Sequence, residues 1–160
     1  MSANVETQLQ QIVDNINDSI KHQMESRAVR ASNELRTAAL LTLRGQRSGR
    51  RYKVPGTHRK QRDKATGKTK NGRYYTASAP GEPPAVRTGA FRLSWQPTSR
   101  VVYGSYISRI ESNLSTDNGR YTLGDILENG TKRMAPRPYQ DKILEKAEKP
   151  IVKIYSEPYF

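Results

Sequence analysis

The chain has no cysteine, so neither a disulfide framework nor a thiolate metal site can form. Histidine is scarce as well, because His22 and His58 are the only two and they lack the paired spacing that zinc sites use. No window holds enough consecutive apolar residues for a transmembrane helix, and the polar N-terminal stretch does not resemble a signal sequence. We therefore expect a cytoplasmic protein without a metal or other cofactor and without a membrane segment.

Large apolar residues are also few. Leu, Ile, Val and Phe number 29 of the 160 residues, a share of about 18% that lies below the ~20% at which a highly charged chain is expected to be disordered. Clear apolar periodicity on both sides of the central segment nevertheless predicts folded structure. The two observations agree if the chain folds but completes its buried surface with partner subunits. A monomer with a small core and a long disordered loop is the alternative.

Patterns typical of catalysis are absent too. Four carboxylates lie near one another in the β-prone half of the chain: Glu111, Asp117, Asp125 and Glu128. No Ser–His or metal-ligand pattern accompanies them, so we expect them to cap turns and helices. Gly67-Lys68-Thr69 is similar to the end of a Walker phosphate loop, but Arg62 stands where the first glycine of that loop belongs. We expect no enzymatic activity.

Positive charge, by contrast, is abundant and concentrated. Twelve of the 28 Lys and Arg residues lie between Arg44 and Arg73, where Asp63 is the single acid, and this segment holds +11 of the formal net charge of +13. Like charges at this density repel one another, so we expect the segment to become ordered only against an anionic partner. The candidate contacts are Arg47, Arg50, Arg51, Lys53, Arg59, Lys60, Arg62 and Lys64.

Tyrosines accompany these cations. Tyr52 lies within the basic segment, and Tyr74 and Tyr75 follow it, a mixture that can clamp phosphates and stack on bases. Cations on a loop contact phosphates rather than base edges, so binding to double-stranded DNA would be non-specific and steeply salt-dependent. An arm that binds acidic protein accounts for the same residues equally well.

The first 43 residues predict one long amphipathic helix. Apolar residues recur there at steps of three and four: Val5, Leu9, Ile12, Ile16, Ile20, Met24, Ala28, Ala31, Leu35 and Ala38. No Gly or Pro occurs before Gly45, so the helix would span roughly 60 Å, more than a compact domain of this size needs. We expect its first five Leu, Ile and Met positions (Leu9, Ile12, Ile16, Ile20 and Met24) to contact other subunits. Two shorter helices with an unmarked break are the alternative.

The middle of the chain predicts irregular and extended structure. Residues 45–71 have no apolar period and should form a loop, with a short hairpin at Asn71-Gly72 followed by β-prone residues 73–76. A stiff, proline-rich strap over residues 79–85 comes next. Alternation of Phe91, Leu93 and Trp95 predicts a strand that Pro97 ends, and residues 100–110 form a second β-prone run broken by Gly104.

The end of the chain predicts two helices. Residues 121–128 should form a short helix that stops at Asn129-Gly130. A last helix should cover about residues 137–149, with Ile143, Leu144 and Ala147 facing inward, and Pro150 should kink or restart it before an apolar patch over residues 151–155.

The sequence as a whole predicts a single α+β domain over residues 1–160. Its parts are the long helix (1–43), a long basic loop (44–73), and a C-terminal part (74–160) with a small antiparallel sheet, an elbow motif and the last helix. Helices from both ends of the chain should pack on the sheet.

Two motifs resemble one bacteriophage family. In residues 128–139 a helix stops at Gly130, Thr131 can bond the freed backbone, and two prolines lead into the last helix. This string is similar to the E-x-G-T, basic, Met, Ala/Pro, R-P-aromatic signature of the proteins called neck, minor tail or tail-completion proteins. Residues 81–94 resemble that family's proline-rich strap and its T-G-x-aromatic-x-x-S strand. The matching residues are Gly81, Pro83, Pro84, Thr88, Gly89, Glu128, Gly130, Thr131, Met134, Pro136 and Pro138.

The resemblance implies a virion protein without catalysis, assembled in the host cytoplasm as a ring of six copies around the DNA channel. Its neighbours would be the head-closure protein and the tail-terminator or tail-tube protein. Residues 128–139 would form a rigid elbow between the last helix and the sheet, and residues 88–95 an inner strand. The basic insertion and the tail after Pro150 lie outside the family signature. A basic nucleic-acid-binding accessory protein is the alternative function.

Overall fold

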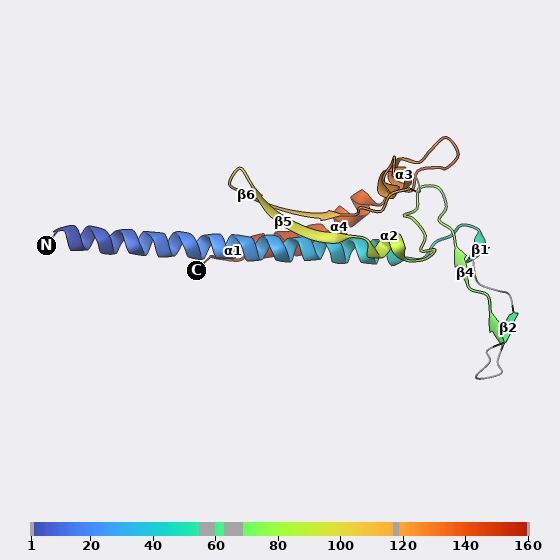
Figure 1. The fold of residues 1–160 in the computed structure, drawn as a ribbon, viewed down its shortest axis with the longest axis horizontal. Helices are drawn as coiled ribbons and strands as arrows, with labels where there is room; N and C mark the ends of the chain where they lie inside the picture. The colour runs from blue at the N-terminus through green and yellow to red at the C-terminus, as the bar shows by residue number, and fades with distance from the viewer. Residues whose placement is uncertain (1, 55–59, 63–68, 117–118, 160) are drawn as a thin grey trace.

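The long helix forms the axis of the molecule. The computed structural model describes residues 2–54, 60–62, 69–116 and 119–159. Helix α1 (Ser2–Arg44) is uninterrupted over 43 residues (Figure 1), which corresponds to roughly 65 Å at 1.5 Å per residue. Its sequence contains no Gly or Pro, and Gly45 follows its last residue. The single long helix is therefore confirmed, and the alternative of two helices with a break is wrong.

A two-stranded hairpin and the last helix pack against α1. Strands β5 (Gln96–Val102) and β6 (Ser105–Glu111) are antiparallel, joined by Tyr103 and Gly104, whose φ angles are both positive, as the tight hairpin turn requires. Helix α4 (Gln140–Tyr155) runs along α1 beside this hairpin (Figure 1). The α+β fold with helices from both ends of the chain is confirmed.

The core is small and lies near the C-terminal end of α1. Its buried members are Ala38, Ala39, Leu43, Trp95, Tyr139, Ile143 and Ala147. Phe91, Trp95 and Tyr139 form an edge-to-face aromatic cluster with ring centroids 5.5–5.9 Å apart, a favourable geometry for such rings. Small side chains on α1 let the other elements approach closely, so that the Ser108 hydroxyl of β6 donates to the carbonyl of Ala28 at 2.8 Å.

The strand predicted over residues 88–95 is wrong. Residues Ala90–Leu93 form a short helix, α2, which begins after Gly89 at φ 90°. The helical turn places Phe91 and Trp95 on one side, where both contact Tyr139, and leaves Leu93 exposed. Pro97 does not end a strand either, because it lies within β5 opposite Ile110. A two-stranded sheet has only edge strands, and an edge strand tolerates proline.

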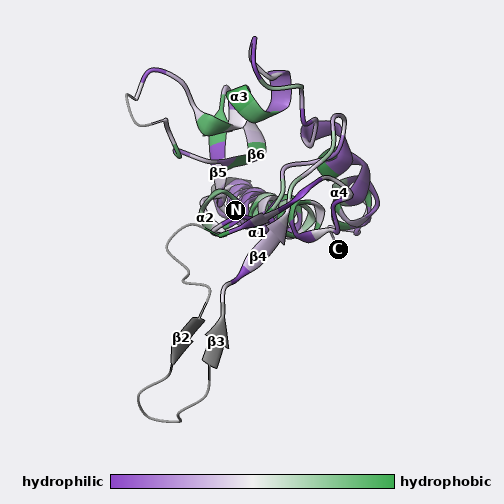
Figure 2. Ribbon diagram, turned by 90° about the vertical axis from the view of Figure 1, so that its right-hand side faces the viewer, coloured by the Kyte–Doolittle hydropathy of each residue, from purple (hydrophilic) through white to green (hydrophobic). Residues whose placement is uncertain are grey.

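The prediction of an irregular loop over residues 45–71 is wrong in part. Strand β1 (Arg51–Lys53) pairs with β4 (Tyr74–Thr76), and β2 (Lys60–Arg62) pairs with β3 (Thr69–Asn71). The β-prone residues after Gly72 are a strand as predicted, but their partner lies at the other end of the basic segment rather than across Asn71-Gly72. Viewed along α1, β4 leaves on the opposite side from β5, β6 and the hydrophobic α3 (Figure 2). We call residues 50–76 the basic arm.

The C-terminal part contains one confirmed helix end and two corrections. Helix α3 (Leu123–Asn129) stops at Gly130 as predicted. Helix α4, however, continues through Pro150 to Tyr155 without restarting. Ile143 and Ala147 are buried as predicted, but Leu144 is 59% exposed, because the inward stripe continues through Ile154 at steps of three and four residues and Leu144 lies about 100° away from it.

The neighbouring positions Ile143 and Leu144 test this orientation. We expect Ile143→Ala to lower the free energy of unfolding by about 2–5 kcal/mol, since it removes buried methylene groups and leaves a cavity. Leu144→Ala on the exposed face should change it by less than about 0.5 kcal/mol. Urea unfolding followed by circular dichroism compares the two, and equal losses would show that the assigned inward face of α4 is wrong.

Candidate assembly surfaces and basic arm

The apolar stripe of α1 is half buried and half exposed. Ala28, Ala31 and Ala38 are buried against the rest of the fold. Every residue from 4 to 19 is exposed, and Leu9 and Ile16 are 57% and 43% accessible. We call residues 4–19 the free half of α1, which extends beyond the other elements in Figure 1. The predicted interface residues Leu9, Ile12 and Ile16 lie in this half, whereas Ile20 and Met24 are half-buried next to the covered part.

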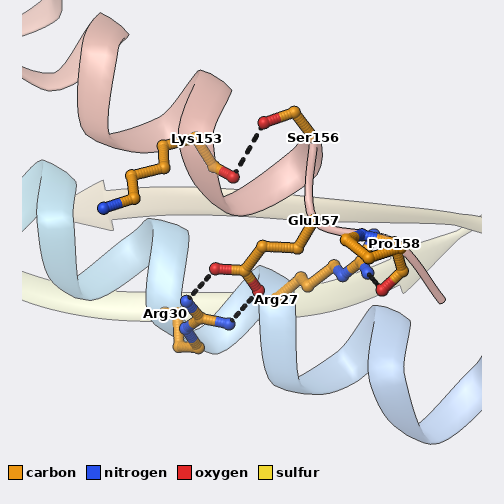
Figure 3. Close-up of polar contacts among 6 residues, drawn as sticks. All are labelled: Arg27, Arg30, Lys153, Ser156, Glu157 and Pro158. Carbon is orange, nitrogen blue, oxygen red and sulfur yellow. Dashed lines mark hydrogen bonds and ion pairs between the residues drawn. The ribbon is translucent and has the colours of Figure 1, made fainter. Parts of the chain in front are cut away.

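The C-terminal tail marks where the covered part of α1 begins. The buried Arg27 donates to the carbonyl of Pro158 at 2.8 Å, and its guanidinium lies 3.8 Å from the centre of the Tyr159 ring. Arg30 donates to both carboxylate oxygens of Glu157 at 2.6 Å (Figure 3). These hydrogen bonds lower the pKa of Glu157. Sequence analysis missed this tail clamp because its partners are more than 120 positions apart, and no local pattern joins them.

The elbow motif is held by backbone geometry. Gly130 has φ 76° and ψ −170°, a region that only glycine adopts readily. A Cβ at this position would lie 2.6 Å from the carbonyl oxygen of Met134. Thr131 and Met134 exchange two backbone hydrogen bonds, of 2.8 and 3.2 Å. The carboxylate of Glu128 accepts from the amide of Tyr139 at 2.9 Å and so caps the start of α4.

The two motifs that resemble the phage family contact each other. The amide of Gly81 in the strap donates to the carbonyl of Pro136 in the elbow at 3.1 Å. The Arg137 guanidinium donates to the carbonyl of Ser78 at 2.9 Å, and the Lys142 ammonium donates to the carbonyl of Gly81 at 3.3 Å. Segments 55 to 61 positions apart in sequence therefore form one connected unit, which joins the strap to the first turn of α4.

The strap is also tied to the end of α1. Glu82 accepts from the amide and hydroxyl of Ser48 at 3.1 and 2.7 Å and from the amide of Ala79 at 2.9 Å. These bonds, the Ser48 hydroxyl first, lower the pKa of Glu82 from 4.5 to about 2. Arg47 donates to the carbonyls of Thr42 and Pro84. The guanidinium of Arg47, a predicted contact for DNA or an acidic partner, links the last turn of α1 to the strap.

A cavity of about 440 Å³ opens between the strap, α2, α3 and the elbow. Its apolar lining includes Leu43, Val86, Phe91, Leu123, Leu127 and Met134. Arg87, Arg92 and Arg137 add positive charge, and Tyr75 and Ala77 at the base of the basic arm complete one wall. We call this cavity the strap pocket. Its volume lies in the range of ligand-binding pockets, and it was not predicted because segments that are distant in sequence form it.

The described base of the basic arm stacks cations on tyrosines. Tyr52 and Tyr75 face each other across β1 and β4 with ring centroids 5.9 Å apart. The Arg50 guanidinium lies 5.6 Å from the ring centre of Tyr52, and that of Arg51 lies 4.8 Å from that of Tyr74. The charged groups remain exposed, so they can pair with an anion while the rings hold them in place.

Of the other predicted cations, one side chain is described by the structure and four are not. Lys53 is exposed on β1. Lys60 and Arg62 belong to β2, but their side chains are not described, and Arg59 and Lys64 lie outside the described residues. The sequence prediction for these four positions stays a prediction.

Three of the four carboxylates considered for chemistry have structural contacts. The hydroxyl of Thr122 bonds to Asp125 at the start of α3, Glu128 caps α4, and Glu111 pairs with Arg109 at 2.6 Å. Asp117 lies outside the described residues. Within the described part of the chain, no three His, Asp or Glu side chains are close enough to hold a metal ion. None of the helices described there is long and apolar enough to cross a membrane.

Gly130 allows a sharp test of the elbow. We expect Gly130→Ala to destabilise the fold by about 1–3 kcal/mol, because the new methyl group meets backbone atoms of Met134 and Pro136 in a strained conformation. Gly104→Ala is the matched control, since Gly104 also has positive φ (77°) but nothing described within 4 Å of the added Cβ. Thermal unfolding of both variants measures the difference, and a melting temperature for Gly130→Ala at or above that of the control would contradict the rigid elbow.

Comparison of the chain with known protein families, curated proteins and solved structures finds no match. The functional argument therefore depends on the surfaces described above: the free half of α1, the joined strap and elbow, the strap pocket, and the arginine–tyrosine stacks of the basic arm.

Proposed function

We propose that this chain is a non-enzymatic structural subunit of the neck of a long-tailed bacteriophage. Copies of the chain would form a ring that joins or completes the tail around the DNA channel. The observation that carries this proposal is the free half of α1, because it presents an apolar stripe that its own fold leaves uncovered.

The free half is too apolar to be explained as a solvated end of a helix. Val5, Leu9, Ile12, Val13 and Ile16 are all exposed, and full burial of each such side chain contributes about 1.5–3 kcal/mol. Contiguous apolar surface of this kind marks interaction sites in soluble proteins. A chain with a small core gains most from an assembly that covers this stripe.

The joined motifs support the choice of family. The strap and the elbow carry the resemblance to neck and tail-completion proteins, and they contact each other through the Gly81–Pro136 and Arg137–Ser78 hydrogen bonds. The resemblance supplies the expected neighbours, which are the head-closure and the tail-terminator or tail-tube proteins, and the expected copy number of six.

Charge placed on the stripe tests this function. We expect the wild-type chain of 18.1 kDa to form an assembly of several copies and to bind isolated phage tail tubes. The double variant Leu9→Asp, Ile16→Asp should remain monomeric, because burying an unpaired carboxylate in an apolar interface costs several kcal/mol. Both positions are exposed in the single chain, so its circular dichroism spectrum should not change.

Light scattering and native mass spectrometry measure the assemblies. The double variant Gln11→Asp, Asn15→Asp adds the same charge to the polar side of the free half and serves as the control, which should assemble like the wild type. A wild-type chain that stays monomeric both alone and with tail tubes would disprove the neck proposal.

The basic arm favours a second candidate function, that of a nucleic-acid-binding accessory protein. The specific observation is the pair of exposed guanidiniums of Arg50 and Arg51 stacked on Tyr52 and Tyr74. Fixed cations next to aromatic rings are typical of surfaces that bind nucleic-acid backbones.

Salt-dependent DNA binding tests this second function. We expect Arg50→Gln, Arg51→Gln to weaken binding to double-stranded DNA and to reduce the slope of log K against log salt concentration by about 0.9 per lost phosphate contact. Arg100→Gln, Arg120→Gln removes two exposed cations outside the arm and should leave the slope unchanged. Fluorescence anisotropy titrations measure both, and a wild type that binds no DNA at low salt would rule the function out.

A further inference from the structure

The free half of α1 and the strap pocket are two uncovered apolar surfaces at opposite ends of the same helix. Leu43, which lines the pocket, lies roughly 50 Å from Leu9 along α1 at 1.5 Å per residue. Since no Gly or Pro interrupts α1, the free half cannot fold back to reach its own pocket. Any contact between the two surfaces must therefore join different copies of the chain.

Charge distinguishes the ways in which two copies can meet. Residues 1–25 carry Glu6, Asp14, Asp18 and Glu25 against Lys21, a formal charge of −3, while the rest of the chain carries +16 and brings the total to +13. Pairing two free halves with each other would bring like charges together. Placing a free half on the body of another copy brings opposite charges together, which favours association and fixes its orientation.

The pocket has the chemistry to receive an amphipathic helix. Its lining is largely apolar, and Arg87, Arg92 and Arg137 add positive charge at its walls. On α1, Glu6 and Asn17 lie next to Val13 at helical spacings of seven and four residues, so they flank the apolar stripe with acceptor oxygens.

The base of the basic arm lies next to the same pocket. Tyr75 and Ala77 form part of its wall, and Arg51 pairs with Thr76 on the neighbouring strand. A helix seated in the pocket by its apolar stripe would turn its opposite side outward, and that side carries Asp14 and Asp18. We expect the cations at the base of the arm to attract those carboxylates.

We propose that the free half of α1 of one copy docks, through Leu9, Ile12 and Ile16, in the strap pocket of a second copy. This inference rests on the proposed function, because it names the contact between neighbouring subunits of the ring. The two surfaces differ, so the interface is head-to-tail, and such interfaces generate closed rings when the rotation between neighbours closes. Each copy gives its helix to one neighbour and receives a helix from the other.

The absence of cysteine makes a disulfide cross-linking test direct. Single variants Leu9→Cys, Ile12→Cys and Ile16→Cys sample the stripe, so the result does not depend on one register, and Val86→Cys marks the exposed edge of the pocket. Each stripe variant is mixed with the Val86→Cys chain under mild oxidation. We expect at least one mixture to give a covalent dimer on a non-reducing gel, and the double variant that combines that stripe position with Val86→Cys to give a ladder of higher oligomers.

Two controls separate docking from random collision. Gln11→Cys lies on the polar side of the free half and should not cross-link to Val86→Cys. Val101→Cys is an exposed valine of β5 outside the pocket lining and should not cross-link to any stripe variant. Equal cross-linking of the controls and the test pairs would overturn the docking proposal.

The outcomes distinguish this inference from the proposed function. If a stripe variant alone gives as much covalent dimer as its mixture with the Val86→Cys chain, the helices pair with each other, and the pocket is not the receiving site. If light scattering shows an assembly but no stripe variant cross-links to Val86→Cys, docking is again wrong while the ring proposal survives. If the wild-type chain does not assemble at all, both fail together.

Discussion

The uninterrupted length of α1 is the constraint on which the rest of the structure depends. A helix of 43 residues without Gly or Pro cannot bend around the small body that follows it. The body covers only the part from the tail clamp onward, where Arg27 and Arg30 hold the C-terminal residues. The apolar stripe continues past that clamp without a change in spacing, so the same pattern that packs the core also produces an uncovered surface. The covered and uncovered portions of the stripe are separated because α1 is straight and rigid.

A polar framework compensates for the small core. Large apolar residues are few, and the buried cluster relies on alanines, three aromatic rings and a few aliphatic side chains. Outside that cluster, Glu82, Arg47 and Glu128 satisfy backbone groups of segments that would otherwise be held weakly. Hydrogen bonds in which one partner is charged are stronger than those between neutral groups. Orientation of α4 thus depends on the elbow as much as on apolar packing.

The sequence predicts the elements whose pattern is local and misses those that tertiary contacts decide. Helix α1 and the end of α3 at Gly130 follow from apolar period and from glycine chemistry, which need no distant partner. The apolar residues Phe91, Leu93 and Trp95 are compatible with either a strand or a helical turn. The helical turn forms because it lets both Phe91 and Trp95 contact Tyr139. The pairing of β1 with β4 joins the two ends of a charged segment, which composition describes only as a loop.

The candidate site shows the same division. Leu9, Ile12 and Ile16 are exposed, which agrees with their prediction as surface contacts from the apolar spacing of the sequence. The strap pocket could not be predicted in this way, because the fold brings together segments that are distant in sequence to form it. In the sequence, Arg47 has the same charge as Arg50 and Arg51. It differs from them in the fold, because the carbonyls of Thr42 and Pro84 lie where its guanidinium can donate to them.

Segregation of charge along the chain gives the two ends different roles. The N-terminal residues are acidic and apolar, and the arm and pocket are basic, so each copy carries a donor surface and an acceptor surface that repel their own kind. Self-complementary surfaces favour two-fold dimers, whereas surfaces that differ favour repeated head-to-tail contacts. In the proposed docking, the rigidity of α1 would set a fixed spacing between bodies, because one straight helix connects the docked end of a copy to its own body. In the proposed docking, a chain would reach its full buried surface only when every copy has both neighbours, a condition that a closed ring meets and a linear chain does not.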